Sequence, residues 1–80
     1  TKSMTGHPLG AASAVEAIVC FLALENNFMP PTINYNKKDA LCDLDYIPNC
    51  GREKNLNVVL TNASGFGGLH AAMILKKYID

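Results

Sequence analysis

The sequence predicts an α/β chain, and two segments carry this prediction. Residues 9–24 are rich in alanine and leucine, which are strong helix formers, and the segment is apolar on every face. Residues 57–62 form a β-branched apolar run of strand length, which is typical of a strand buried on both faces. A chain of 80 residues is at most one domain, and it has too little other apolar surface to cover such a helix. We therefore expect the chain to be part of a larger protein.

The first ten residues form a polar loop that carries Lys2 and His7 and leads directly into the predicted helix. Pro8 suits the first helical position, and a residue before proline avoids the helical conformation, so we expect His7 to be the N-cap. The positive end of the helix dipole disfavours a charged imidazole, which would leave a neutral hydrogen-bond donor. The simpler alternative is that His7 only caps the helix.

The middle of the chain is predicted to consist mainly of connecting segments. The helix should end near 25–27, where two asparagines precede a pair of prolines, and 28–34 should be an extended connector. The acids within 37–45 lack the glycine and glutamate of a calcium loop, so a solvated loop is expected there. Residues 46–47 could form a short edge strand, and 52–54 a charged surface bend.

A glycine cluster at 65–68 follows the predicted strand. A dinucleotide-binding loop would need a third glycine where His70 stands and a long helix after it, so nucleotide binding is not expected. An aromatic residue between glycines suggests a gate, although Phe66 could instead pack into a core. The segment 69–78 is compatible either with a helix or with a hairpin return that pairs with 57–62.

Composition and charge exclude several classes of function. Seven basic and seven acidic residues give a net charge of zero, so there is no electrostatic footprint for nucleic acid or an anionic membrane. The apolar run is short for a membrane span and is interrupted by Glu16. The irregularly spaced Cys20, Cys42 and Cys50 indicate neither a disulfide framework nor a zinc site. We expect no nucleic-acid partner, no membrane partner and a cytoplasmic location.

Five stretches, taken in order, carry a family resemblance: TKSMTGHPLGAASAVEAI, PPTINY, CDLDYIPN, NVVLTN and SGFGG. Together they resemble the C-terminal part of the β-ketoacyl-acyl-carrier-protein synthases, the condensing enzymes of fatty-acid and type II polyketide synthesis. The general elongating synthase of the fatty-acid type is closest in pattern, whereas SGFGGLHAAM leans toward polyketide ketosynthases. Leu69 and His70 replace a Thr-Asn pair usual in the fatty-acid branch, and Pro8 is unusual there, so the branch stays open.

The resemblance implies a fold and an assembly. Members have the thiolase-like fold, in which two similar halves form five layers, α-β-α-β-α, and they act as homodimers. Residues 8–25 would then be the buried central helix of the second half, and 69–78 would be its last strand. Residues 1–80 would be the C-terminal segment of that half and not a complete domain.

The resemblance also implies a decarboxylative Claisen condensation. A cysteine holds the acyl chain as a thioester, malonyl on the carrier protein loses CO₂, and the resulting carbanion attacks. His7 matches the family histidine that hydrogen-bonds the malonyl thioester oxygen, and Lys2 matches a lysine that tunes the site electrostatically, with a plain surface charge as its alternative. Phe66 matches the gate whose backbone N–H contributes to the oxyanion hole, on a hinge that includes Gly65 and Gly67.

Supporting residues and partners follow from the same resemblance. Glu16 matches a buried acid near the lysine, and with Thr61 and Asn62 it falls where some members hold a structural monovalent cation. No other cofactor is implied. The implied partners are the acyl carrier protein, acyl and malonyl thioesters, and a second copy of the enzyme.

The family nucleophile and first catalytic histidine have no counterpart in this chain, and none of its three cysteines stands in the nucleophile's context. We therefore expect the isolated chain to be inactive. One alternative is a non-catalytic partner subunit of the chain-length-factor kind, although such subunits usually lack the histidine that His7 matches. Another is a stand-alone binding module, which would unfold cooperatively by itself.

Overall fold

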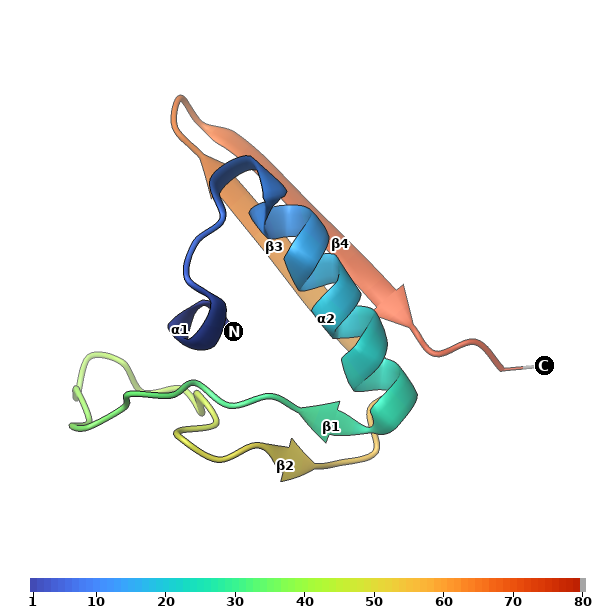
Figure 1. Cartoon of the computed structure of the whole chain (residues 1–80), viewed down its shortest axis with the longest axis horizontal. Coiled ribbons are helices and arrows are strands. Elements are labelled where there is room, and N and C mark those ends of the chain that lie inside the picture. The colour runs from blue at the N-terminus through green and yellow to red at the C-terminus, as the bar shows by residue number, and fades with distance from the viewer. Residues whose placement is uncertain (80) are drawn as a thin grey trace.

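The computed structural model describes residues 1–79 (Figure 1). One long helix lies along a two-stranded antiparallel ribbon, and a shorter ribbon follows the C-terminal end of that helix. A short helical turn comes first and stands apart from both ribbons. The elements are, in chain order, α1 (Lys2–Thr5), the 3-10 turn η1 (Leu9–Ala11), α2 (Ala12–Asn26), β1 (Phe28–Met29), β2 (Arg52–Glu53), β3 (Val58–Gly65) and β4 (Leu69–Lys76).

The long helix and the long ribbon confirm the predicted α/β class. Helix α2 packs mainly on β3, and β4 pairs with β3 antiparallel, from Val58 opposite Lys76 to Gly65 opposite Leu69. Alternate residues of β3 are half-buried, as expected for a strand with one covered face. The prediction of a strand buried on both faces is therefore wrong within the described residues, because no element covers the second face and Leu60 is 61% exposed there.

The start of the helix differs from the prediction. Helix α2 begins at Ala12, because Leu9 has a φ of +51°, which takes the chain off a right-handed helical path. Pro8 precedes the η1 turn and is not the first residue of the α-helix. His7 is consequently not its N-cap, and the helix-dipole argument for a neutral imidazole no longer applies. The predicted C-terminus is confirmed: α2 ends at Asn26, and Asn27 follows in the left-handed conformation.

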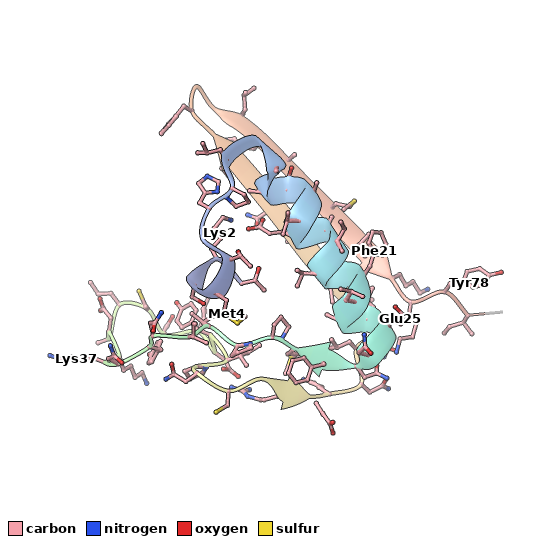
Figure 2. The ribbon with its side chains drawn as sticks, viewed as in Figure 1. Lys2, Met4, Phe21, Glu25, Lys37 and Tyr78 are labelled. Carbon is pink, nitrogen blue, oxygen red and sulfur yellow. The ribbon has the colours of Figure 1, made fainter. Side chains whose placement is uncertain are left out.

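Helix α2 is apolar all round, as predicted, but the described residues cover only one of its sides. Ala12 and Leu24 are its buried residues. Phe21, by contrast, is 55% exposed, and its ring projects from the helix uncovered (Figure 2). Ile18 and Leu22 are exposed as well. The predicted burial of 8–25 is thus not achieved by residues 1–79 alone, because the hairpin, β1 and the η1 turn together cover only part of the helix surface.

Residues Leu9–Asn26 have the length and hydropathy of a membrane span, so the expectation that the apolar run is short for one is wrong. A core helix of a soluble protein meets the same criteria. Two observations favour a core helix. Glu16 lies in the middle of the segment and pairs with Lys2, and one side of the helix packs on β3. A charge paired within the protein and a face fitted to a sheet are both typical of a helix in a globular core.

Asn27 joins the helix to both ribbons. Its backbone carbonyl accepts a hydrogen bond from the Lys54 N–H (2.9 Å). Its side-chain Oδ1 accepts two more, from the Leu56 N–H (3.1 Å) and from Lys77 Nζ (2.6 Å). One residue therefore ends the helix, fixes the segment that enters β3 and binds the segment that leaves β4.

The short ribbon corrects two predictions for the middle of the chain. Residues 52–54 were expected to be a bend, yet Arg52 and Glu53 form β2 opposite β1. Residues 46–47 do not form a strand; the isolated bridge in this region joins Thr32 to Pro48. Gly51 explains how the ribbon closes, because a Cβ there would lie 2.2 Å from the ring of Phe28.

The glycine turn connects β3 to β4 through residues 66–68. Gly67 and Gly68 have φ values of +86° and +84°, which only glycine adopts readily, whereas Gly65 is the last residue of β3. Next to the turn, the side chains of Ser64 and His70 face each other across the ribbon at 3.0 Å. The segment 69–78 is thus a hairpin return over Leu69–Lys76, as the resemblance implied.

The loop before β2 is held by an ion pair. Arg52 Nη1 and Nη2 lie 2.5 and 2.7 Å from the two carboxylate oxygens of Asp45, and Asp45 Oδ1 also accepts the Ile47 N–H at 3.0 Å. The bidentate guanidinium, with help from that N–H, lowers the pKa of Asp45 from its ordinary value of 3.8 to about 2. This Arg52–Asp45 pair, which we call the clamp, holds residues 45–52 in a closed loop.

Asp45→Asn should therefore destabilise the protein only where the carboxylate is charged. The folded-state pKa lies below the ordinary value, so the clamp contributes fully above pH 3.8 and its contribution is lost as the pH falls toward 2. We expect the urea midpoints of wild type and Asp45→Asn to differ at pH 5 and to converge toward pH 2. Asp43→Asn, at an exposed position in the same loop, is the matched control. A difference that stays constant with pH would contradict this account.

Candidate active site

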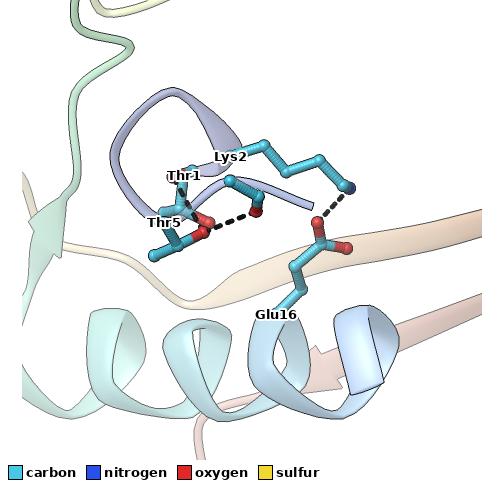
Figure 3. Close-up of polar contacts among 5 residues, drawn as sticks. Thr1, Lys2, Thr5 and Glu16 are labelled. Atoms are coloured by element: carbon cyan, nitrogen blue, oxygen red, sulfur yellow. Dashed lines mark hydrogen bonds and ion pairs between the residues drawn. The ribbon is translucent and has the colours of Figure 1, made fainter. Parts of the chain in front are cut away.

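Lys2 and Glu16 form an ion pair that joins α1 to α2 (Figure 3). Lys2 Nζ donates a hydrogen bond to Glu16 Oε1, across 14 residues of sequence. The Glu16 side chain is 19% exposed and the Lys2 side chain 49% exposed, so the carboxylate is the more buried partner. Burying a carboxylate is costly unless it is paired, and Lys2 supplies the compensating charge. The two predicted site residues are thus brought together, and Lys2 is not an isolated surface charge.

The ion pair lies at the wall of a cleft of about 440 Å³. Helix α2 forms one wall, β3 another, and the connector after β1 a third. Thr61 and Asn62 lie on the β3 wall, so all three residues predicted to hold a cation border this cleft together with Lys2. The remaining lining residues are mostly apolar: Val19, Cys20, Ala23, Met29, Pro30, Ile47, Leu56, Val59 and Leu60, with Thr1 beside Lys2.

Cys20 is the cysteine that reaches this cleft. Burial raises the pKa of its thiol; a side-chain hydrogen bond with Thr61 opposes the rise, and the nearby charge of Glu16 adds to it. A thiol with a raised pKa is protonated at neutral pH and is a poor nucleophile. This agrees with the prediction that Cys20 is not the family nucleophile. Cys42 and Cys50 are exposed free thiols.

His7 and Phe66 lie away from the cleft. His7 is exposed in the segment between α1 and η1. Phe66 is fully exposed at the tip of the hairpin, so the alternative of a ring packed into the core of the chain is not what forms. None of the described cavities is lined by both residues. Residues 1–79 therefore assemble the Lys2 side of the predicted site, while the roles of His7 and Phe66 stay predictions.

The fit of a monovalent cation can be judged from the donor groups. Lys2 occupies Glu16 Oε1, which leaves Glu16 Oε2 available, and Thr61 lines the same cleft from the half-buried face of β3. Asn62 follows Thr61 in the same strand, so its side chain points to the opposite, exposed face. Carboxylate and hydroxyl oxygens suit a hard cation, so Glu16 and Thr61 fit one, whereas the Asn62 side chain does not face them. Within residues 1–79, no three acidic, histidine or cysteine side chains gather in the manner of a transition-metal site.

Sequence reasoning missed the contact that joins α1 to the connector after β1. Ser3 Oγ accepts the Ile33 N–H at 3.0 Å. The two residues lie 30 positions apart in the sequence, and no local pattern predicts such a pairing. The contact depends on the approach of the connector to α1, which the structure shows.

Known proteins that are similar to this chain are β-ketoacyl synthases. Residues 1–36 match the family described as the β-ketoacyl synthase C-terminal domain. The 3-oxoacyl-[acyl-carrier-protein] synthase 2 of Coxiella burnetii is 48% identical over 80 residues, which are 100% of this chain and 19% of that protein. The chain thus spans about a fifth of the length of this relative.

Two solved structures have the same arrangement of elements. The ishigamide ketosynthase/chain length factor superposes with a TM-score of 0.95 at 49% identity, covering 98% of this chain and 19% of that one. A ketosynthase solved with its type II polyketide acyl carrier protein superposes with a TM-score of 0.89 at 46% identity, covering 99% of this chain and 19% of that one. The chain is therefore similar, over nearly its whole length, to the C-terminal part of β-ketoacyl synthases.

Proposed function

We propose that the chain is the C-terminal part of a β-ketoacyl-acyl-carrier-protein synthase, an acyltransferase that catalyses decarboxylative Claisen condensation in fatty-acid or polyketide synthesis. The observation that carries the proposal is the Lys2–Glu16 pair at a cleft, within a segment that carries the family match. In the reaction, malonyl thioester loses CO₂ and its carbanion attacks the acyl thioester carbonyl. The new carbon–carbon bond forms as the cysteine thiolate leaves.

In this proposal His7 donates a hydrogen bond to the malonyl thioester oxygen as the enolate develops. Such a donor acts where negative charge grows in the transition state. Lys2 holds a positive charge nearby, and Glu16 fixes its position. Phe66, on the exposed hairpin tip with Gly65 and Gly67, gates the site and offers its backbone N–H as an oxyanion donor.

We also propose that the complete protein has the five-layer thiolase-like fold. Residues 1–79 form one helix on a two-stranded ribbon, which is a small part of a five-layer thiolase-like molecule. The uncovered apolar side chains of α2, such as Phe21, support its placement as the central helix of the second half. We also propose the family's homodimer, a cytoplasmic location, and acyl and malonyl thioesters on an acyl carrier protein as substrates. The carrier-protein complex of a related ketosynthase supports that partner.

A monovalent cation would be held by Glu16 and Thr61, which border the same cleft. It would supply positive charge that stabilises Glu16 and ties β3 to α2. Its role would be structural, and no other cofactor is required by the chemistry.

The test compares the full-length protein with the isolated 80-residue chain. We expect the full-length protein to condense an acyl thioester with malonyl carrier protein and to release CO₂, and the isolated chain to do neither. The reason is that the nucleophile and the first histidine must come from outside this chain. Activity of the isolated chain would contradict the residue roles, and an inactive full-length protein that carries the nucleophilic cysteine would overturn the proposal.

The chain-length-factor alternative has one structural relative in its favour, the ketosynthase/chain length factor structure. The presence of His7 favours the catalytic subunit, because the partner subunits usually lack that histidine. Sequencing the gene upstream of Thr1 decides between them, since the catalytic subunit needs a cysteine nucleophile and the factor does not.

A further inference from the structure

The short helix α1 has little holding it in place. It contains no buried residue, and its backbone comes close to no other helix or strand of residues 1–79. The hydrogen bonds of Thr5 Oγ1, to the carbonyls of Thr1 (3.3 Å) and Gly6 (3.0 Å), stay within the turn itself (Figure 3). A single isolated helical turn is not stable in water by itself. Its position must therefore come from contacts that its side chains make elsewhere.

Two neighbouring side chains make those contacts. Lys2 reaches α2 through Glu16, and Ser3 reaches the connector after β1 through the Ile33 N–H, at 3.0 Å. These are the polar links between α1 and the remainder of the described chain. The Lys2 side chain is long and 49% exposed, so its ion pair alone does not fix the turn. The Ser3 contact is short, partly buried and made to backbone, and it therefore sets the position of the turn.

We propose that Ser3 is a positioning residue: it docks α1 on the connector, and this docking places Lys2 beside Glu16 at the cleft. The expected effect on catalysis rests on the proposed function, whereas the expected effect on the position of Lys2 rests on the hydrogen bonds of α1. Without the hydroxyl, the partly buried Ile33 N–H loses its acceptor, and the turn loses one of its two links. Lys2 would then spend part of its time away from Glu16.

The experiment uses the full-length protein with Ser3→Ala, Ser3→Thr and Ser13→Ala. Ser3→Thr keeps a hydroxyl that can accept the Ile33 N–H. Ser13→Ala is the matched control, since Ser13 is exposed in the first turn of α2 and its side chain makes no hydrogen bond in the described chain. Lys2 accessibility is measured by amine labelling and mass spectrometry, and protection of the Ile33 amide by hydrogen exchange. Decarboxylation of malonyl thioester and acylation of the nucleophile are measured separately.

We expect Ser3→Ala to label Lys2 several-fold faster and to lose protection at Ile33. Decarboxylation should fall about 10- to 100-fold, because small misplacements of a charged group have effects of this size, while acylation stays as in wild type. Ser3→Thr should restore all readouts, and Ser13→Ala should match wild type.

Unchanged Lys2 labelling in Ser3→Ala would overturn the inference, as would an equal loss of acylation and decarboxylation. A wild-type protein that releases no CO₂ would instead count against the proposed function. In that case the labelling and exchange readouts would still decide whether Ser3 positions Lys2.

Discussion

Replacing His7 with alanine in the full-length protein should reduce CO₂ release from malonyl carrier protein by about 10²–10³-fold. Removing one hydrogen-bond donor to a developing oxyanion has effects of this size, because the donor interacts more strongly with the transition state than with the substrate. Acylation of the nucleophile should persist, since that step does not form the enolate. The measurement is release of labelled CO₂ under single-turnover conditions, with acylation followed by mass spectrometry.

His70→Ala is the matched control for His7→Ala. His70 is the other histidine of the chain, it is exposed on β4, and its ring contacts Ser64 across the hairpin. We expect this variant to retain wild-type CO₂ release. Equal release by wild type and His7→Ala would remove His7 from its assigned role.

Replacing Glu16 with glutamine should have the second largest effect. The substitution keeps the shape of the side chain but leaves Lys2 without a charged partner at the cleft. The Lys2 side chain is 49% exposed, so solvent screens the pair, and we expect a loss of about 0.2–1 kcal/mol in the free energy of unfolding. Decarboxylation should also fall about tenfold or more, because Lys2 is no longer held in place.

Glu25→Gln is the control for Glu16→Gln. Glu25 is exposed near the end of the same helix, and no ion pair involves it in the described chain (Figure 2). Thermal stability of wild type and both variants, measured in sodium, potassium and a bulky organic cation, separates the two proposed roles of Glu16. Potassium or sodium should stabilise wild type and Glu25→Gln but not Glu16→Gln. Equal stability of all three proteins would show that Glu16 supports neither Lys2 nor a cation.

The sequence predicted the elements that depend on local composition. The helix, its C-terminal stop at Asn26 and Asn27, and the strand that leads into the glycine turn all follow from residue preferences within a few positions. The start of the helix was wrong because a leucine adopts a positive φ, which a propensity scale does not anticipate. The strand β2 was missed because it depends on pairing with β1, which lies more than 20 residues earlier.

Burial could not be predicted from this chain alone. The apolar helix and strand were expected to be covered on all sides, yet one side of each packs against the other and the rest is exposed. Residues 1–79 contain a single layer of each kind, so the burial that the sequence pattern predicts would need further layers. The candidate site is divided in the same way. Lys2, Glu16, Thr61 and Asn62 border one cleft within the chain, whereas His7 and Phe66 lie away from it and their roles stay predictions.

A crystal structure of the full-length protein with an unreactive malonyl thioester analogue tests the central claim most directly. We predict that a ring nitrogen of His7 lies about 2.6–3.2 Å from the thioester oxygen, with Phe66 bordering the same cavity and Lys2 still paired with Glu16. His7 and Phe66 on separate surfaces, with no cavity between them, would contradict the account.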